Sequence, residues 1–392
     1  MPLVDMRDML HHAYGNGYAV GAFDLVSLDF LEGIIQAAEN QQAPVILSLA
    51  ESHFEYFNVA YIMAATVAAA RGAAVPVAVH LDHGRALESV VRAIRLGCNG
   101  VMLDASHRSY EDNVRLTREV VAVAHRCGVP VEGELGYVAG MEGEDAVEHP
   151  GRLIYTSPEE ACRYVAETGV DFLAVSIGTV HGRFRGEPRL DFPRLEAIRR
   201  RVNIPLVIHG GTGLSPDHYR ALIARGVAKI NYYTALSDVA ARRIRSNSAA
   251  AAEAGYTRLL QGVREAVRQE VETCMQLWGG SGRAKDVLAH CRRWHEVEHV
   301  VEFNADAAMD EKQVHEMMRK GQKVLSRIPG VRRVFIGRSV TPNSRYRYCW
   351  IIRFAGTQVI ESYRNHPDHL AFADTAFRPI AGDRLTIDFE EW

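Results

Sequence analysis

The sequence predicts an α/β protein, a TIM (β/α)8 barrel followed by a small ferredoxin-like α+β domain. Over about the first 250 residues, eight short apolar runs follow one another with helical patterns between most of them, which is the repeat of a (β/α)8 barrel. A glycine-rich break at 279–282 ends this repeat, and the order then becomes strand–helix–strand–strand–helix–strand, which is typical of a ferredoxin-like sheet. We expect the barrel over 1–286, a linker over 287–296 and the second domain over 297–392.

The expected barrel strands are continuous aliphatic runs, as in parallel strands that are buried on both faces. Helical patterns at 29–41 and 86–96 follow the first and third runs, and 235–275 is predicted as helix after the last one. A doubly wound open sheet is the alternative, but no G-x-G-x-x-G follows the first run. The strands are expected at 18–23, 44–50, 75–81, 100–103, 129–135, 172–177, 205–209 and 228–231.

The C-terminal domain is predicted from a second set of patterns. An amphipathic helix over 310–328 is stopped by Pro329-Gly330, and a shorter helix is expected over 357–365. Strands are expected at 299–303, 331–336, 348–354 and 385–389.

The composition excludes several classes of function. The formal net charge is −3, which gives no general attraction to nucleic acid or to anionic membranes. No apolar run approaches the roughly 18–20 residues that span a bilayer, and the first residues lack the pattern of a signal peptide. The six cysteines include no C-x-x-C pair. We therefore expect a cytoplasmic protein without a disulfide framework.

Three histidines follow the third, sixth and seventh of the expected strands: His83, His181 and His209. Catalytic groups of TIM barrels lie at the carboxyl ends of the strands, so these side chains can converge above the barrel. Three imidazoles with one open position are a catalytic zinc arrangement. A lone histidine is more often a hydrogen-bonded packing residue, but three at equivalent strand ends indicate metal ligands.

Carboxylates accompany these histidines. Asp82 precedes His83 and is placed to transfer a proton near the metal, although it can instead orient a histidine. The strand ends also carry Asp104 and Glu132-Gly133-Glu134, whose carboxylates either hold an auxiliary metal or position water, or have a structural role. The glycine-rich acidic stretch 140–145 is a candidate mobile lid, or a solvated loop.

Glycine-rich and polar residues follow the last two barrel strands. In TIM barrels, the loops after strands seven and eight commonly bind phosphate through backbone N–H groups and a helix N-terminus. Glycine lets the backbone approach the anion, and threonine adds a hydroxyl donor. The predicted phosphate residues are Gly210, Gly211 and Thr212 after one strand, and Asn231, Tyr232, Tyr233 and Thr234 after the next.

Together these blocks resemble the class II, metal-dependent ketose-bisphosphate aldolases, the group that contains fructose- and tagatose-bisphosphate aldolases. The resemblance covers about residues 1–286. It is carried by H-L-D-H-G at 80–84, L-D-A-S-H at 103–107, V-E-G-E-L-G at 131–136, A-V-S-I-G-T-V-H-G at 174–182 and H-G-G-T-G at 209–213.

The resemblance implies reversible aldol cleavage of a ketose 1-phosphate or 1,6-bisphosphate to dihydroxyacetone phosphate and an aldehyde. His83, His181 and His209 match the zinc ligands of the family, and Asp82 matches its proton donor. Zinc would act as the electron sink for the enediolate that cleavage leaves. No lysine Schiff base is required, and Lys229 is the one lysine near the expected strand ends.

The remaining positions match the other subsites of the family. Asp104 and Glu134 correspond to a second divalent-metal position. The ketose phosphate would bind at Gly182, Gly210 to Thr212 and Asn231 to Thr234, where a monovalent cation, Na⁺ or K⁺, can assist.

Two departures from the family pattern fall on the aldehyde side. The family usually has A-F-N near the first strand and S-E-G-A after the second, whereas Asp24 replaces the asparagine and Ala50 the serine here, with His53 nearby. Loss of a serine and gain of a carboxylate disfavour a distal phosphate. The alternatives are an aldolase-like lyase with an unphosphorylated aldehyde partner and a non-catalytic sugar-phosphate-binding protein, and the intact Asp82 counts against the second.

The C-terminal segment resembles the stress-responsive dimeric α/β barrel family. The matching stretches are H-V-V-E-F at 299–303, I-P-G-V at 328–331 and Y-R-N-H-P-D-H at 363–369. Since that family pairs two sheets into one barrel, the resemblance implies a homodimer or a higher homo-oligomer that associates through this domain. His366 and His369 leave open a second small-molecule site.

Overall fold

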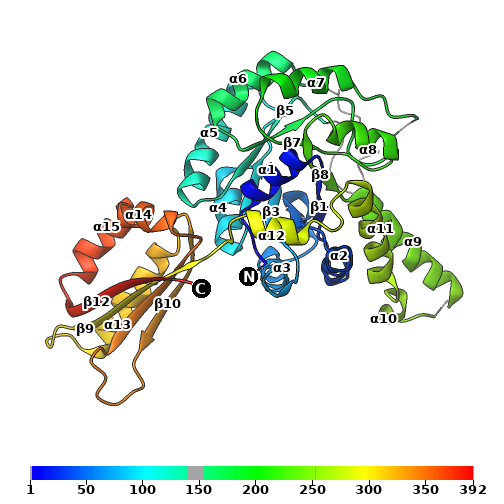
Figure 1. Cartoon of the computed structure of the whole chain (residues 1–392). Coiled ribbons are helices and arrows are strands. Elements are labelled where there is room, and N and C mark those ends of the chain that lie inside the picture. The colour runs from blue at the N-terminus through cyan, green and yellow to red at the C-terminus, as the bar shows by residue number, and fades with distance from the viewer. Residues whose placement is uncertain (1, 139–153, 185, 252, 392) are drawn as a thin grey trace. The chain divides into compact units, whose positions relative to one another are not determined.

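The protein is described by a computed structural model that covers all residues except 1, 139–153, 185, 252 and 392 (Figure 1). The chain forms two compact units, and the unit that holds the barrel ends at Arg293. The predicted fold class is confirmed, because eight strands form a closed barrel and four more form a second sheet. Among the described residues, no helix is long and apolar enough to cross a membrane. The candidate lid at 140–145 lies outside the described residues.

The barrel strands are parallel and follow one another in sequence order, with β8 closing onto β1. Each strand overlaps a run that was predicted from its aliphatic residues, and differs from it by a few residues at most. The bounds are β1 Val20–Asp24, β2 Val45–Ala50, β3 Val77–Gly84, β4 Gly100–Leu103, β5 Val131–Leu135, β6 Phe172–Val175, β7 Leu206–Ile208 and β8 Val227–Tyr232.

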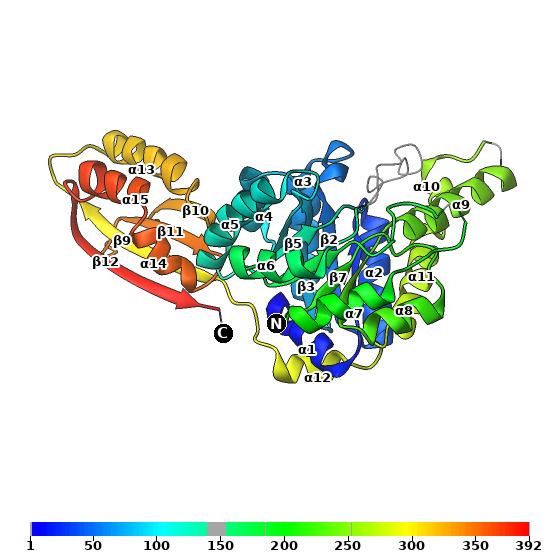
Figure 2. The ribbon, with the colours of Figure 1, turned by 90° about the horizontal axis from the view of Figure 1, so that it is seen from above.

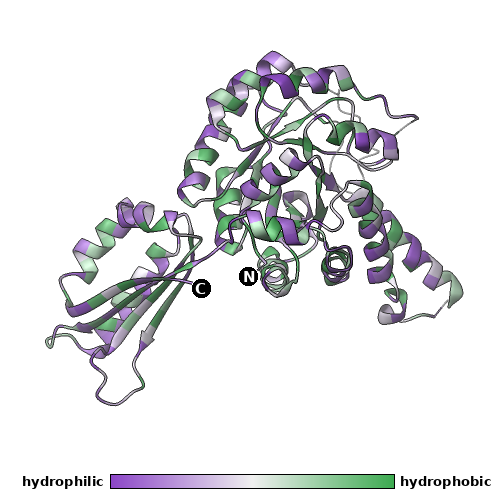
Figure 3. Cartoon of the chain, viewed as in Figure 1, coloured by the Kyte–Doolittle hydropathy of each residue, from purple (hydrophilic) through white to green (hydrophobic). Residues whose placement is uncertain are grey.

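The helices surround this barrel (Figures 1 and 2). Figure 3 shows hydrophilic and hydrophobic residues alternating along them, as in helices with one buried face. The bounds are α1 Met6–Asn16, α2 Leu28–Gln41, α3 Val59–Gly72, α4 Leu87–Leu96, α5 Tyr110–Arg126, α6 Pro158–Thr168, α7 Phe192–Arg201, α8 Pro216–Ile223, α9 Thr234–Ala250, α10 Tyr256–Leu259, α11 Val263–Leu277 and α12 Ala284–His290, with a 3₁₀ turn, η1, at Glu51–Glu55.

One predicted helix is wrong and one helix was not predicted. The helix expected over 235–275 is divided into α9, α10 and α11, because Gly262 adopts a φ of 78° before α11 and Gly255 caps α10. Helix α1 had a readable signal, since the Asp5 carboxylate accepts hydrogen bonds at its first turn and Gly17 ends it in the left-handed conformation.

The barrel interior is apolar near the start of the strands and polar near their carboxyl ends. On β3, Ala78 belongs to the buried apolar cluster, and alternation places His80 and Asp82 on the same inward face. Glu132 on β5 and Lys229 on β8 are also fully buried. A polar layer therefore covers the apolar core just below the barrel mouth.

The second unit has the predicted ferredoxin-like order. Its sheet is antiparallel in the order β10-β11-β9-β12, and the rings of Phe303 and Trp350 contact the helical segment that covers one face. The bounds are β9 Val297–Ala305, α13 Glu311–Leu325, β10 Val331–Arg338, β11 Tyr348–Phe354, α14 Gln358–Arg364, α15 Pro367–Phe372, a π-helical turn, η3, at Ala373–Phe377, and β12 Ala381–Glu390.

The opposite face of this sheet carries a row of apolar side chains. The register aligns Ile387, Val300, Ile351 and Phe335 across the four strands. Phe335 and Ile387 are 41% and 39% exposed, and Phe389 is 52% exposed. Exposed apolar patches of this kind mark association surfaces.

The two histidines noted in this unit have structural contacts. His366 caps α15 by accepting a hydrogen bond from the backbone N–H of Asp368. The ring of His369 packs on Tyr363 at 4.5 Å between centroids.

Candidate active site

The three predicted zinc ligands meet at the carboxyl end of the barrel. His83 is the next-to-last residue of β3, while His181 and His209 follow β6 and β7. One nitrogen from each ring lies within 4.8 Å of the other two. The structure therefore brings together three imidazoles that are separated by 98 and 28 residues along the chain.

Two of these rings are oriented by buried carboxylates. His83 Nδ1 lies 2.8 Å from Asp104 Oδ2, and His209 Nε2 lies 2.9 Å from Glu132 Oε1. Since a carboxylate only accepts, each of these nitrogens carries the proton. The two remaining nitrogens, His83 Nε2 and His209 Nδ1, face each other at 2.9 Å. Two facing lone pairs repel unless a proton or a metal cation lies between them, so the donor set fits a metal ion with carboxylate-held ligands.

The local charge also favours a cation. Burial alone would favour neutral His209, but the negative charges of Asp82 and Glu132 raise its pKa. A divalent ion at this position would be attracted by the same carboxylates.

The backbone conformation at the end of β3 explains why the side chains of Asp82 and His83 point in different directions. His83 has a φ of 44°, which is uncommon for a residue with a side chain. The pairing of β3 with β4 is irregular between Leu81 and Gly84. As a result, Asp82 is fully buried in the barrel, while the side chain of His83 is 13% exposed at the mouth. Such a conformation at a reactive centre is typical of functional residues.

Asp82 lies beside the three histidines. Its Oδ2 accepts a hydrogen bond of 2.8 Å from Asn231 Nδ2 and lies 4.0 Å from His83 Nε2. The carboxylates that orient His83 and His209 are Asp104 and Glu132. Orienting a histidine, which was the alternative role for Asp82, is therefore the role of Asp104 and Glu132.

Sequence reasoning missed a buried chain of polar groups beneath the histidines. Lys229 Nζ lies 2.8 Å from Glu132 Oε2 and donates to Asn231 Oδ1 at 2.6 Å. Because Glu132 holds His209 and Asn231 holds Asp82, Lys229 connects a candidate ligand to the candidate proton-transfer group. A signal was available, since Lys229 and Asn231 are two residues apart on a strand and share its inward face. A fully buried lysine is also rare.

A second metal-type group adjoins the first. Ligand atoms of His83, Asp104 and Glu134 lie within 4.8 Å of one another. Burial and the nearby charge of Asp104 raise the pKa of Glu134 to about 7. A second divalent ion here would favour the ionised form of that carboxyl.

A small cavity beside His181 contains most of the predicted phosphate residues. Gly210 has a φ of 68°, and a Cβ there would lie 2.2 Å from the carbonyl oxygen of Val180, so glycine is required. Tyr232 does not line the cavity, because its hydroxyl contacts Glu270 and its ring packs on Trp278. The lining includes Gly182, Gly210, Gly211, Thr212, Asn231, Tyr233 and Thr234.

The predicted aldehyde-side residues are all buried. Ala50 is paired with Asp82 across β2 and β3, and Asp24 lies at the end of β1. The ring of His53 lies 4.4 Å from that of Tyr233. The structure thus places Ala50 next to the candidate proton-transfer residue and His53 next to the phosphate cavity.

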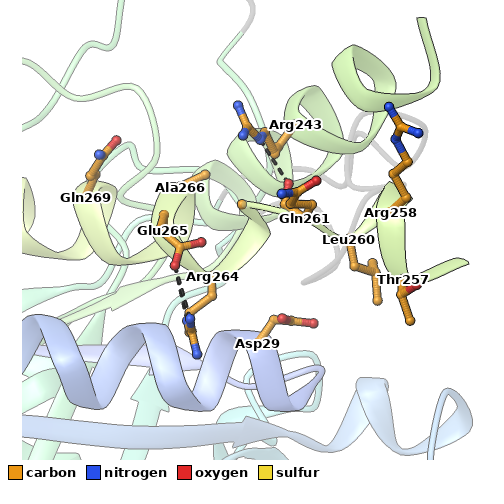
Figure 4. Close-up of a pocket in the computed structure, with 11 residues that line it drawn as sticks. Asp29, Arg243, Thr257, Arg258, Leu260, Gln261, Arg264, Glu265, Ala266 and Gln269 are labelled. Atoms are coloured by element: carbon orange, nitrogen blue, oxygen red, sulfur yellow. Dashed lines mark hydrogen bonds and ion pairs between the residues drawn. The ribbon is translucent and has the colours of Figure 1, made fainter. Parts of the chain in front are cut away.

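Two further cavities help to delimit the site. One of about 460 Å³ is lined by His83, Asp104 and His181, together with Arg85 and Arg108, which sequence reasoning missed. A wider cavity of about 950 Å³ lies at α10 and α11 and contains none of the candidate residues (Figure 4). Arg264 there pairs with Glu265 and Glu32.

Both units match known protein families. The family model described as "Fructose-bisphosphate aldolase class-II" matches residues 4–283, and that described as "Stress responsive A/B Barrel Domain" matches residues 297–391. The chain is 41% identical over 288 residues, 72% of its length, to the whole of "Probable fructose-bisphosphate aldolase" of Bacillus subtilis (strain 168). It is 40% identical over 289 residues, 73% of its length, to the whole of "Fructose-bisphosphate aldolase" of Staphylococcus aureus (strain Mu50).

Solved structures are similar over the same part of the chain. The YdjI aldolase of Escherichia coli K12 is 34% identical with a TM-score of 0.64, covering 72% of this chain and 99% of that one. A putative fructose-1,6-bisphosphate aldolase of Coccidioides immitis is 32% identical with a TM-score of 0.65, covering 71% and 97%.

Proposed function

Because the chain belongs to the class II fructose-bisphosphate aldolase family, we propose that it is a zinc-dependent aldolase acting on a ketose 1-phosphate or 1,6-bisphosphate. The observation that carries this proposal is the convergence of three imidazoles next to Asp82 and a glycine-lined cavity. Family membership makes the chain an aldolase, which speaks against the non-catalytic alternative. What we propose beyond family membership is the identity of its metal and of its substrate.

His83, His181 and His209 would hold the zinc ion, with a position left for substrate oxygen atoms. When bound, zinc supplies a Lewis acid that stabilises negative charge on the substrate oxygens as the carbon–carbon bond breaks. The contacts of Asp104 and Glu132 keep two of the rings in the tautomer that can bind it. Asp104 and Glu134 are the proposed holders of a second divalent ion.

Asp82 would move the proton of the reaction. On cleavage it accepts the proton of the C4 hydroxyl group, and on condensation it returns that proton. The hydrogen bond from Asn231 stabilises the ionised carboxylate, which is the form that accepts a proton. Full burial keeps bulk water away from the transfer.

The ketose phosphate would bind in the cavity beside His181. Gly182, Gly210 and Gly211 let backbone N–H groups approach the phosphate, and Thr212 and Thr234 add hydroxyl donors. The cavity also meets the N-terminus of α9, whose dipole favours an anion. A sodium or potassium ion at this position would offset part of the phosphate charge.

Asp24 and Ala50 favour an aldehyde half without a distal phosphate. A buried carboxylate at the end of β1 would repel a dianion, and Ala50 offers no hydroxyl group to it. We therefore rank an unphosphorylated aldehyde product above glyceraldehyde 3-phosphate.

A cleavage assay on a panel of ketose 1-phosphates and ketose 1,6-bisphosphates tests the proposal, with dihydroxyacetone phosphate as the measured product. Activity should disappear on dialysis against a chelator and return with zinc. His181→Ala should lack both activity and the tightly bound ion. Turnover that survives the chelator would reject the metal, and a preference for fructose 1,6-bisphosphate would reject the ranking of the aldehydes.

We also propose that the C-terminal unit joins two copies of the chain. The row formed by Ile387, Val300, Ile351 and Phe335 is an apolar face that a second copy of the same sheet would cover. Burial of such a face against its symmetry mate is the usual form of a twofold interface.

A further inference from the structure

A second cluster of metal-type donors lies at the amino end of the barrel, away from the candidate active site. It consists of His12 on α1 and of Asp286 and His290 on α12, whose ligand atoms lie within 4.8 Å of one another. Helices α1 and α12 lie side by side in both views of the ribbon (Figures 1 and 2). Tyr18, which contacts His12, comes just before β1 and so marks the amino end of the barrel strands.

The carboxylate stands between the two imidazoles. Asp286 Oδ2 lies 3.2 Å from His12 Nε2, and Asp286 Oδ1 lies 3.1 Å from His290 Nδ1. Asp286 and His290 are four residues apart on one helix, so they share a face. Both side chains are partly exposed, at 41% and 65%, which leaves solvent access for an ion and its water ligands.

His12 is held in a ligand-ready orientation. Its side chain is only 9% exposed, and its Nδ1 lies 3.0 Å from the hydroxyl group of Tyr18, which is itself buried. When Nδ1 donates its proton to that oxygen, Nε2 carries the lone pair and points at Asp286. This is the arrangement by which an outer partner selects the metal-binding nitrogen of a histidine.

We propose that His12, Asp286 and His290 bind a divalent transition-metal ion of the zinc class that clips α1 to α12. Two imidazoles and one carboxylate suit this class, with water in the remaining position. Bonds of about 2.0–2.2 Å place tetrahedral ligand atoms about 3.4 Å apart. His12 Nε2 and Asp286 Oδ2, at 3.2 Å, already meet this spacing. His290 Nδ1 lies 2.9 Å from the backbone carbonyl oxygen of Asp286 and donates its proton there, so rotation of the exposed His290 side chain would bring its Nε2 to the ion.

The clip would join the first and last helices of the barrel unit. Ion pairs of Arg292 with Asp5 and Asp8 already fasten the same junction. Salt weakens exposed ion pairs of this kind. A bound ion would add stabilisation of the folded state that increases with the metal concentration.

Zinc titration by calorimetry of the full chain after removal of bound metal tests the clip. The titration is done in the His83→Ala background, because His83 belongs to two of the three metal-type groups at the barrel mouth. The third group, Asp82, Glu132 and His209, shares Glu132 with the ammonium group of Lys229. One zinc equivalent should still bind in this background, and should be lost in His12→Ala and in His290→Ala. Tyr18→Phe should weaken it by about 10–100-fold, as outer partners of ligands do. His11→Ala, an exposed neighbour on α1, is the matched control and should bind normally.

Absence of zinc binding in the His83→Ala protein, or binding that persists in His12→Ala and His290→Ala, would overturn the clip. Should His83→Ala fold poorly, the intact chain can be used at saturating zinc, where His290→Ala should bind one equivalent fewer than His11→Ala. The melting temperature of His290→Ala should also rise less on addition of zinc than that of His11→Ala. Neither result depends on aldolase activity, so failure of the clip and failure of the proposed function are distinguishable.

Discussion

Lys229 offers the sharpest test of how the site is built. Its ammonium group lies 2.8 Å from Glu132 and 2.6 Å from Asn231, and the side chains of Lys229 and Glu132 are 0% exposed. Lys229→Met keeps the length of the side chain but removes the charge. Glu132 is then a buried carboxylate without its main counter-charge, and Asn231 loses the donor that orients it.

The expected loss can be estimated from this geometry. Breaking a buried ion pair by removing one partner costs about 3–5 kcal/mol. At about 2–4 °C for each kcal/mol in a domain of this size, the melting temperature should fall by roughly 6–20 °C. If the loss of order reaches Asp82 and His209, a shift near 1 Å would reduce kcat by about 10²-fold, with a smaller effect on KM.

The stability deficit should depend on pH through His80. Burial and the charge of Lys229 hold the pKa of His80 well below its usual range, and His80 Nε2 lies 3.7 Å from Glu132 Oε2. Removing Lys229 raises this pKa, so His80 takes up a proton as the pH falls and partly replaces the lost charge. Because the folded parent holds the pKa of His80 below its unfolded value, the parent loses stability as the pH falls. The variant, with a higher His80 pKa, loses less, so the deficit should be smaller at pH 5.5 than at pH 8.

Thermal unfolding at the two pH values and steady-state kinetics measure these effects. The double variant Lys229→Met/Glu132→Gln has no unpaired buried charge and should recover most of the stability. Its kcat should stay low, because His209 no longer contacts a carboxylate. The reasoning would be refuted if Lys229→Met melted within about 1 °C of the parent and kept its kcat within about twofold.

Three further substitutions test separate parts of the molecule. Asp82→Asn should lower kcat by about 10²–10⁴-fold while the bound metal stays, as elemental analysis would show, because it removes only the proton-transfer group; loss of the metal would contradict this. Gly210→Ala should abolish saturation by substrate, since its Cβ would lie 2.2 Å from a carbonyl oxygen, whereas Gly213→Ala, whose Cβ meets only a ring carbon at 3.7 Å, should be milder; equal effects would count against the cavity. Ile387→Asp should convert a dimer to a monomer in light scattering, while Lys320→Asp on α13 should not, and an unchanged mass would exclude this face.

The predictable parts of the fold are the elements that a short stretch of sequence indicates by its own composition. Strands such as Val45–Ala50 are mostly aliphatic, as expected for strands that are buried on both faces. The break between α9 and α11 was missed because the segment is rich in alanine, arginine and glutamate. Gly255 and Gly262 were the local signals of the break, and Gly262 adopts the positive φ that glycine allows.

The candidate site was predictable where a residue's position relative to a strand end indicates its role. His83, His181 and His209 each lie at or just after the carboxyl end of a strand, so one rule about barrel ends found all three. Tyr232 was predicted with the phosphate residues because the sequence reasoning did not separate the two faces of the strand end, and it does not line the cavity. Alternation sends Tyr232 outward to Glu270, while its neighbour Tyr233 lines the cavity.

The link between Lys229 and Glu132 has a different origin. These residues are 97 positions apart, on β8 and β5, and no pattern in either strand refers to the other. They meet only because the barrel closes and both point into its polar upper layer.

That layer also explains why the barrel mouth suits a divalent cation. Carboxylates of Asp24, Asp82, Glu132 and Glu134 are all at most 1% exposed, and the fully buried Lys229 pairs with Glu132. Buried charges of one sign are costly until they are paired or bind a metal. Lys229 offsets one carboxylate and thereby holds Glu132 against His209. The negative charge that is left over lies next to three imidazole rings, which is where a divalent ion would lower the electrostatic energy most.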